Sequence, residues 1–359
     1  MTIGDLRFGL HTFGDVTVDA AGELLPQAQV IRNVVAEAVL ADECGIDFFG
    51  VGEHHRADFA VSAPDIVLAA IAGQTRRIHL GSAVTVLSSD DPVRVFERFS
   101  TLDAVSGGRA EVILGRGSFI ESFPLFGFPL EQYEQLFEEK LQLFAELRKE
   151  APVTWSGATR SGLSNQKVYP PTAGGSLPTW IAVGGSPDSV VRAAHHGFPL
   201  MLAIIGGEPL RFAPYVDLYH RALAQFEQAT QPVGVHSHGY VARTDQQALD
   251  ESWPHYEAMH AKIGSERGWP PMSRDQYDAG AGPEGALFVG APETVAAKIV
   301  ATAQGLGLSR FDMKYSIGSL PHEQLMTSIE LYGREVIPLV REQLEAARSA
   351  APAPAQEGR

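Results

Sequence analysis

The chain has 359 residues, enough for one large α/β domain, and 45% of them are hydrophobic, which is typical of a protein with an extensive core. Its formal net charge of −15 argues against nucleic acid or an anionic membrane as the main partner. The single cysteine, Cys44, excludes an intrachain disulfide, and no export signal or apolar run of about 20 residues is visible. We therefore expect a reducing, cytoplasmic location.

The first half of the chain alternates short apolar runs with helical patterns. The apolar runs predict strands over residues 6–11, 48–52, 78–82 and 110–114. The patterns between and after them predict helices over residues 26–44, 64–76, 92–106 and 131–149, several of which begin at a proline. Residues 151–177 are rich in Gly, Ser and Pro, and we interpret them as an insertion in which 153–155 and 167–169 pair as a hairpin.

The second half repeats the alternation. Strands are predicted over residues 179–183, 199–204, 233–241 and 311–314, with helices over 187–196, 209–229, 245–261, 294–303 and 325–340. Residues 263–290 form a second irregular stretch, which in a compact protein is usually a functional lid or a disordered segment. The Ala-Pro repeats of residues 346–359 predict a disordered tail.

Eight strand–helix units predict a (β/α)₈ TIM barrel, one domain over residues 1–345 with insertions after strand 4 and after strand 7. A doubly wound sheet is the alternative, but the glycine fingerprint expected after its first strand is not present. In either fold, the chemistry gathers at the carboxyl ends of the strands.

The second predicted strand ends at Glu53-His54-His55, which makes His54 the best candidate for a catalytic residue. A histidine just past a strand end can take or give a proton near neutral pH. The alternative is that His54 and His55 only hydrogen-bond loop carbonyl groups. We interpret Glu53 as a structural residue.

Two glycine-containing segments are candidate anion sites. Arg116 lies between Gly115 and Gly117, where backbone can approach a ligand and Arg can bind phosphate. Ile120 stands where a dinucleotide-binding fingerprint needs its third glycine, so the segment does not match that fingerprint. Gly184-Gly185-Ser186 precedes Pro187 at a helix start, which is a phosphate cradle or simply a tight turn with a serine cap.

Other constellations give weaker signals. His236 and His238 alternate in one strand as metal ligands can, but no third and fourth ligand with suitable spacing are visible, and we predict no metal site. The chain also contains neither a His-Glu-x-x-His motif nor a Gly-x-Ser-x-Gly elbow.

The order and spacing of several motifs together are specific. They run from Val51-Gly52-Glu53-His54-His55 through Gly81-Ser82-Ala83-Val84, Pro92-Val93-Arg94 and Ser106-Gly107-Gly108-Arg109 to Gly115-Arg116-Gly117. Val289–Glu293 and Tyr332–Pro338 continue the pattern. Over its length apart from the tail, the chain resembles the bacterial luciferase-like flavin monooxygenase family.

The resemblance implies a TIM barrel that binds FMN, or in some relatives the deazaflavin F420, at the strand carboxyl ends. By position, it implies that His54 lies beside the isoalloxazine, that Arg116 binds the flavin phosphate, and that Gly184, Gly185 and Ser186 complete the phosphate site. Ala83-Val84 matches a non-proline cis peptide under the flavin ring. Gly115 matches the reactive cysteine of luciferase, so light emission from a long-chain aldehyde is doubtful, whereas flavin binding is not.

The function implied is a two-component monooxygenase. An NAD(P)H:flavin reductase would supply reduced FMN, and the enzyme would use O₂ to oxygenate a small organic substrate, with His54 managing protons. Resemblance also implies a homodimer, and a mobile loop at residues 263–290 in which Trp269 and Tyr277 contact substrate, exclude water or only anchor the loop. The alternatives are an F420-dependent dehydrogenase, a flavin-binding protein without catalysis and, remotely, a metal-dependent hydrolase.

Overall fold

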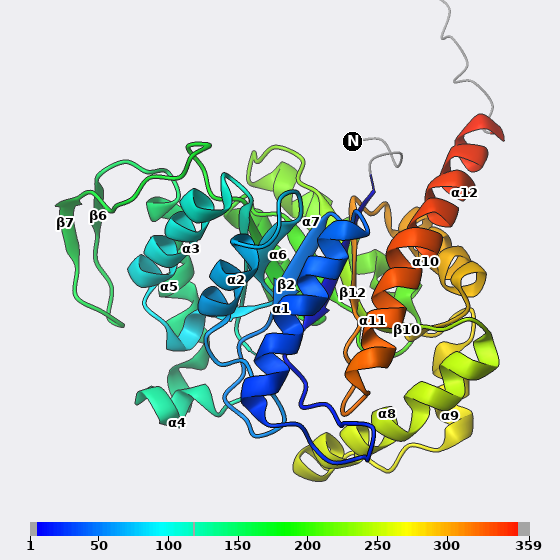
Figure 1. Cartoon of the computed structure of the whole chain (residues 1–359). Coiled ribbons are helices and arrows are strands. Elements are labelled where there is room, and N and C mark those ends of the chain that lie inside the picture. The colour runs from blue at the N-terminus through cyan, green and yellow to red at the C-terminus, as the bar shows by residue number, and fades with distance from the viewer. Residues whose placement is uncertain (1–5, 118, 351–359) are drawn as a thin grey trace, which may run out of the picture.

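Parallel strands close into a barrel in the computed structural model, which describes residues 6–117 and 119–350 (Figure 1). Within the described residues, eight strands form the closed ring, and their order around the barrel is β1 (Arg7–Thr12), β2 (Phe48–Val51), β3 (His79–Ser82), β5 (Ala110–Gly115), β8 (Thr179–Val183), β9 (Leu200–Ala203), β10 (Val233–Val241) and β12 (Arg310–Lys314). Each pairs in parallel with the next, and β12 pairs with β1 to close the ring. The predicted TIM barrel is confirmed, and the doubly wound alternative is wrong.

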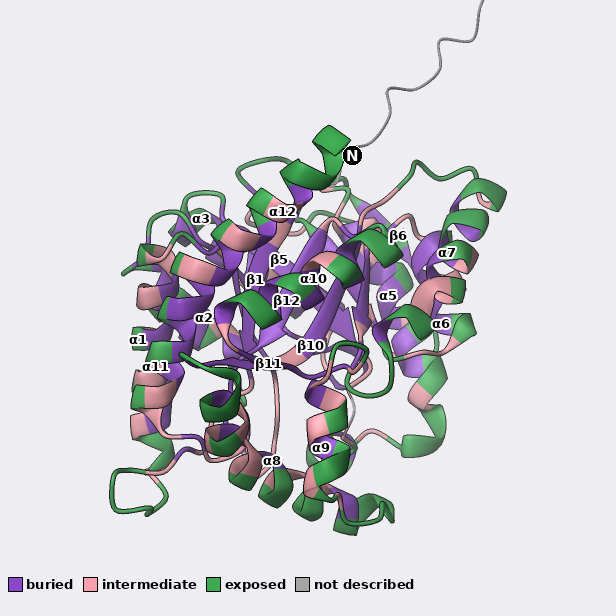
Figure 2. Ribbon diagram, turned by 90° about the vertical axis from the view of Figure 1, so that its right-hand side faces the viewer, coloured by how far each residue is buried: buried purple, intermediate pink, exposed green. Residues whose placement is uncertain are grey.

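Helices surround the barrel and turn their apolar sides inward (Figure 2). They are α1 (Gln27–Glu43), α2 (Pro64–Ala72), α3 (Pro92–Ser106), α5 (Tyr133–Leu147), α6 (Pro187–His195), α7 (Ala213–Gln225), α10 (Pro292–Leu306), α11 (His322–Leu331) and α12 (Ile337–Ala350). The local sequence sets their ends. In α3, for example, Asp91 accepts hydrogen bonds from two backbone N–H groups at the start, and Gly107 takes the left-handed conformation at the end.

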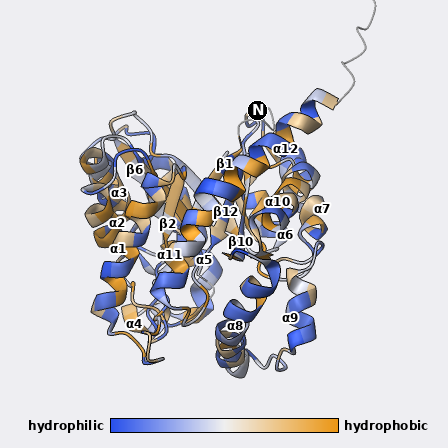
Figure 3. Ribbon diagram, turned by 45° about the vertical axis from the view of Figure 1, so that its right-hand side comes forward, coloured by the Kyte–Doolittle hydropathy of each residue, from blue (hydrophilic) through white to orange (hydrophobic). Residues whose placement is uncertain are grey.

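The core has two parts because successive strand residues point to opposite sides of the barrel wall. The larger part lies between the strands and the helices, where the ribbon is most hydrophobic (Figure 3). The smaller apolar cluster consists of Phe48, Ile113, Trp180 and Met201. The remaining interior volume holds charged residues, which are described with the site.

The insertion after the fourth barrel strand contains the predicted hairpin with a different second strand. β6 (Val153–Trp155) pairs antiparallel with β7 (Leu163–Gln166) rather than with residues 167–169. The observed pairing places Leu163 opposite the buried Trp155, whereas Tyr169 is 63% exposed. Figure 1 shows that this hairpin projects from the side of the barrel.

The insertion after the seventh barrel strand is helical, so the prediction of an irregular stretch at residues 263–290 is wrong. α8 (Asp245–Arg267) continues through Pro254, and α9 (Arg274–Ala281) begins with a capping box between Ser273 and Gln276. A short strand, β11 (Phe288–Gly290), then pairs in parallel with the last residues of β10. The many Gly and Pro residues here terminate helices rather than prevent them.

Smaller elements complete the chain. β4 (Thr85–Val86) pairs with β5, and α4 (Ser122–Phe126) follows β5. The tail boundary predicted at residue 346 is too early, since α12 continues to Ala350; residues 351–359 lie outside the described residues. Among the helices of residues 6–117 and 119–350, none has the length and apolar character needed to cross a membrane.

Candidate functional site

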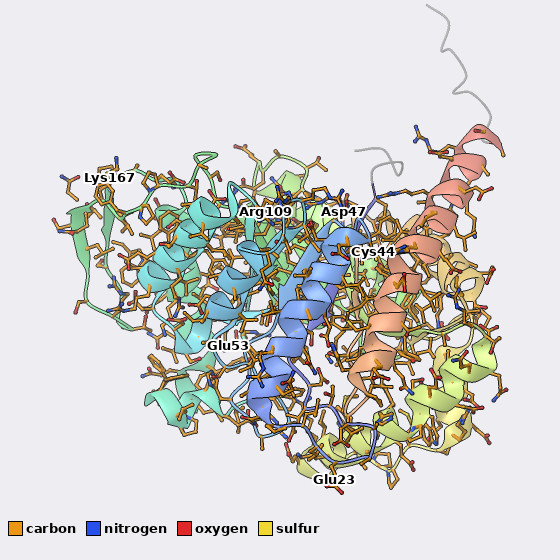
Figure 4. The ribbon with its side chains drawn as sticks, in the orientation of Figure 1. Glu23, Cys44, Asp47, Glu53, Arg109 and Lys167 are labelled. Carbon is orange, nitrogen blue, oxygen red and sulfur yellow. The ribbon has the colours of Figure 1, made fainter. Side chains whose placement is uncertain are left out.

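A cavity of about 800 Å³ opens at the carboxyl ends of the barrel strands. α8 and α9 lie beyond this end of the barrel (Figure 2). Figure 4 labels Glu53 toward this end and Cys44 toward the opposite end, so the single cysteine is remote from the site. Six of the eight predicted site residues line the cavity, namely His54, Ala83, Val84, Gly115, Arg116 and Gly184. Gly185 and Ser186 do not.

His54 is enclosed by aromatic rings. The ring centroids of Phe13 and Phe59 lie 4.4 and 4.5 Å from that of the imidazole, and Phe119 meets it edge-on at 5.4 Å. No described residue hydrogen-bonds the ring, so the alternative of a purely loop-tying role has no support. Burial, together with the charge of Lys314, lowers the pKa of His54 to about 3. His54 is therefore a neutral imidazole near pH 7, with one nitrogen that donates and one that accepts.

The lowered pKa of His54 makes folding stability depend on pH. Between pH 3 and pH 6.5 the unfolded chain binds a proton at this residue and the folded chain does not, so the free energy of unfolding falls as the pH drops below about 6.5. We expect His54→Phe to make this decline shallower by about 1 kcal/mol per pH unit between pH 6 and pH 5. Urea unfolding at a series of pH values measures the slope, and an unchanged slope would contradict a neutral His54.

Glu53 holds the end of β2 in place. One carboxylate oxygen accepts a hydrogen bond from the backbone N–H of Val86 at 2.9 Å, and the other lies 3.0 Å from Nε2 of His55. The carboxylate therefore connects the loop after β2 to β4. This supports the interpretation of Glu53 as a structural residue, with His55 as one of its partners.

The peptide bond between Ala83 and Val84 is cis, as the resemblance implied. Both residues line the cavity, with Gly115 beside them. A Cβ atom at position 115 would lie only 2.7 Å from Cγ2 of Val84, so a cysteine here would require the valine to move. Val84 thus fills the space that a side chain at position 115 would use.

Arg116 reaches from the end of β5 to the start of α6. Its guanidinium donates to Oγ of Ser189 at 3.1 Å, pairs with Glu134 and lies over the ring of Tyr133. A Cβ atom on Gly184 would meet nothing within 4 Å, so there is open space beside the helix N-terminus. A cation, a hydroxyl group and a helix N-terminus around open space form an anion site. Gly185 and Ser186 belong to the same turn, although the Ser186 side chain makes no capping bond.

The histidines of β10 line the cavity but do not form a metal site. Burial lowers the pKa of His238 to about 3 and that of His236 well below its ordinary value. Among the described residues, there is no group of three or more His, Cys, Asp or Glu side chains arranged to hold a metal ion. The metal-dependent hydrolase therefore has no support within residues 6–117 and 119–350.

The two aromatic residues of the second insertion differ in role. Trp269 lines the cavity and is 42% exposed, while Tyr277 is fully buried and hydrogen-bonds Oγ of Ser252 at 2.6 Å. Trp269 is thus the residue placed to contact a ligand. Tyr277 anchors α9 to α8, which agrees with the alternative that such a residue only anchors the loop.

Arg56 connects three segments at the cavity mouth. It pairs with Asp58 in its own loop, with Glu121 after β5 and with Glu266 near the end of α8. Its guanidinium also lies 4.5 Å from the ring centroid of Phe119. These contacts hold the end of α8 against the aromatic residues around His54, and sequence reasoning did not identify them because their partners are far apart along the chain.

The barrel interior below the cavity contains charged side chains that the sequence analysis missed. The fully buried Arg310 donates to Asp312 through Nε and to Glu111 through Nη1 at 2.7 Å, and Lys314 pairs with Asp15 at 2.9 Å. Arg310, Asp312 and Lys314 alternate along β12, which begins one residue before the predicted eighth strand at 311–314. Three charged residues at alternate positions of a buried strand were the available signal for a polar interior.

Comparisons with known proteins agree with this geometry. The model of the luciferase-like monooxygenase family matches residues 7–310. The N-acetyl-S-alkylcysteine monooxygenase of Bacillus subtilis is 31% identical over 192 residues, which are 52% of this chain and 55% of that protein. The chain spans about half the length of the curated relatives that it matches first.

Two solved structures share the fold. The oxygenating constituent of 3,6-diketocamphane monooxygenase from Pseudomonas putida, in complex with FMN, has a TM-score of 0.74 at 18% identity, over 93% of this chain and 98% of that one. The coenzyme F420-dependent tetrahydromethanopterin reductase of Methanopyrus kandleri has a TM-score of 0.70 at 18% identity, over 93% and 99%. Since the family model covers most of the sequence, the chain belongs to the luciferase-like monooxygenase family.

Proposed function

We propose that the protein is a two-component flavin-dependent monooxygenase that uses reduced FMN and O₂ on a small organic substrate. The observation that carries this proposal is that a single cavity is lined both by Arg116 of the anion site and by the enclosed neutral imidazole of His54. Bound FMN would supply the activation of O₂ and the transfer of one oxygen atom. Family membership supports the same reaction class.

The residues present fit FMN. Arg116, Ser189 and the turn at Gly184–Ser186 would hold the phosphate beside the α6 N-terminus, where there is open space next to Gly184. Ala83, Val84 and Gly115 would lie against the flat ring system, because they line the wall between the anion site and His54 with small or apolar groups. None of these contacts requires a charged group to be left unpaired.

The remaining residues would exclude water from the cavity and orient the reacting groups. The phenyl rings around His54 exclude water, and Trp269 covers the cavity from the α8–α9 side. His54 stays neutral, so it can donate one hydrogen bond and accept another without a change of charge. We assign it the movement of protons at the reacting centre.

Several further statements belong to this proposal. A separate NAD(P)H:flavin reductase would supply the reduced cofactor, because the sequence shows no nicotinamide fingerprint. We also propose one catalytic domain that extends to the end of α12 at Ala350, a homodimer and a cytoplasmic location. The deazaflavin F420 is the alternative cofactor, since an F420-dependent enzyme shares the fold.

An anaerobic titration tests the cofactor. The protein is titrated with reduced FMN and, in parallel, reduced F420, and air is then admitted while absorbance is followed. We expect FMN to bind and its oxidation by O₂ to follow kinetics different from those of free FMN. Binding of F420 alone would assign hydride transfer instead, and binding of neither would overturn the proposal.

A variant separates catalysis from storage. We expect His54→Phe to bind reduced FMN with an affinity within about twofold of wild type, because the imidazole contacts Phe13, Phe59 and Phe119 and not the residues of the anion site. The single-turnover rate constant for oxidation of the bound flavin should fall by about 100-fold, as is usual when a proton-transfer group is removed. Unchanged kinetics would favour a flavin-binding protein without catalysis.

A further inference from the structure

A line of three buried side chains connects the charged barrel interior to the cavity. Oδ2 of Asp312 lies 2.8 Å from Nε2 of His11, and Nδ1 of His11 lies 2.6 Å from Nδ1 of His236. Asp312 and His11 are essentially inaccessible, while His236 keeps 8% of its surface exposed and lines the cavity. The series leads from β12 through β1 to β10, three strands that are neighbours in the barrel.

The charge of Asp312 is fixed by its surroundings. Burial alone would raise the pKa of this carboxyl, but the charge of Arg310 and the contact with His11 hold it below its ordinary value. Arg310 in turn lies 3.7 Å from the ring centroid of Phe48 and is also bound by Glu111. Lys314, the nearest other cation, is occupied by Asp15. Asp312 is therefore a carboxylate that can only accept hydrogen bonds.

This carboxylate determines where each imidazole carries its proton. Oδ2 of Asp312 lies 2.8 Å from Nε2 of His11 without the alignment of a hydrogen bond, but a negative charge at this distance favours a proton over a lone pair on that nitrogen, so His11 carries its hydrogen on Nε2. Burial lowers the pKa of His11, so the ring is neutral and its Nδ1 is an acceptor. The 2.6 Å contact then requires His236 to donate from Nδ1. A neutral His236 is left with an unprotonated Nε2.

The unprotonated Nε2 of His236 is available to a ligand in the cavity. Within the described part of the chain, no residue hydrogen-bonds Nε2 of His236, and this atom is not among the fully enclosed unpartnered atoms. The ring of Phe13 is stacked on the imidazole at 6.3 Å, and His238 meets it edge-on. A ligand in the cavity therefore meets an acceptor set among aromatic rings.

We propose that Asp312 and His11 fix the tautomer of His236, which makes its Nε2 a permanent hydrogen-bond acceptor for a hydroxyl or N–H group on an uncharged, largely aromatic substrate. His236 is then a specificity-determining residue, and Asp312 and His11 are positioning residues. The assignment of a substrate rests on the proposed function of the cavity. The tautomer does not, because it follows from the three side chains alone.

Nuclear magnetic resonance tests the tautomers directly, without cofactor or substrate. Long-range ¹H–¹⁵N spectra of the full chain labelled with ¹⁵N-histidine distinguish protonated from unprotonated ring nitrogens, and His236→Phe identifies the signals of His236. We expect the Nε2–H form for His11 and the Nδ1–H form for His236. His196→Phe, a substitution outside the cavity, should leave both sets of signals in place. A His236 that carries its proton on Nε2 would overturn the proposal.

Two positioning variants should change the tautomer. In Asp312→Asn the negative charge is lost, and Nε of Arg310 lies 2.8 Å from both oxygens that the amide replaces, so the amide no longer requires a proton on Nε2 of His11. His236 is then expected to populate both tautomers. His11→Phe retains the pair between Asp312 and Arg310 and is expected to release His236 to a mixture of tautomers. An unchanged His236 in both variants would contradict the positioning role.

Paired ligands test the specificity. We expect 2-naphthol to bind the wild-type protein at least about tenfold more tightly than 2-methoxynaphthalene, the value of a hydrogen bond that only the hydroxyl can donate. Titration calorimetry measures both affinities. His236→Phe should abolish the difference while still binding both compounds. Equal affinities in the wild type would refute the specificity role and leave the cofactor titration unaffected.

Discussion

Replacement of Arg310 by methionine is expected to lower the free energy of unfolding by about 3–5 kcal/mol. The guanidinium is fully buried and satisfies the carboxylates of both Glu111 and Asp312. Without it, Asp312 keeps its contact with His11, which is too deeply buried to take a positive charge at little cost, whereas Glu111 keeps its contacts with Arg7 and His79. The loss measures the cost of unpaired buried charges rather than the value of the ion pair.

Chemical denaturation monitored by circular dichroism would measure this loss. Arg334→Met removes a mostly exposed arginine that pairs with Glu330 and should change stability by less than about 1 kcal/mol. A triple variant, Glu111→Leu with Arg310→Met and Asp312→Leu, should recover most of the stability because both buried carboxylates are removed together with their cation, and Arg7, which then loses Glu111, is partly exposed. An Arg310→Met protein as stable as wild type would show that water or another cation reaches the carboxylates.

The arrangement of the barrel could be predicted because its signals are local. Each strand is a short apolar run, and most of the following helices have a proline start, a capping residue or a terminal glycine, as Asp91 and Gly107 show for α3. Such signals depend only on neighbouring residues, so they can be recognised in a single sequence without an alignment. The helical parts of residues 263–290 were missed because Gly264, Gly268, Pro270, Pro271 and Gly280 interrupt the pattern, whereas the capping box at Ser273 is a weak signal.

The polar interior could not be predicted in the same way. Arg310 and Glu111 are 199 residues apart, and His11 and His236 are 225 residues apart. Only closure of the barrel brings them together, so the sequence could show that charges lie on a buried strand but not which partners neutralise them. His236 and His238 were recognised as a pair, but their chemistry depends on His11 and Asp312.

The site itself was predicted in part. His54, Arg116 and Gly184 follow different strands, and the rule that strand carboxyl ends meet at one end of a barrel was enough to expect them in one cavity. The aromatic enclosure that keeps His54 neutral was not predictable, because Phe13 and Phe119 reach it from loops after other strands. The geometry of the loops determines the protonation state of His54, whereas the position at a strand carboxyl end predicts only where His54 lies.

Replacement of Arg116 by methionine is expected to weaken the binding of FMN by about 10- to 150-fold, the effect of losing a hydrogen bond to a charged group. Riboflavin has the same ring system without the phosphate, so its affinity should change by less than about twofold. The comparison isolates the phosphate because only FMN presents an anion to the site formed with Ser189 and the α6 N-terminus. Fluorescence titration measures both ligands.

The control for this prediction is Arg160→Met. Arg160 is similarly exposed and pairs with Asp91 away from the cavity, so its removal should leave both affinities unchanged. Glu134→Gln provides the opposite change: it removes an exposed carboxylate that competes for Arg116, and should tighten FMN binding by up to about fivefold. Equal losses of FMN and riboflavin affinity in Arg116→Met would mean that Arg116 shapes the cavity wall, and the phosphate would then have to bind elsewhere.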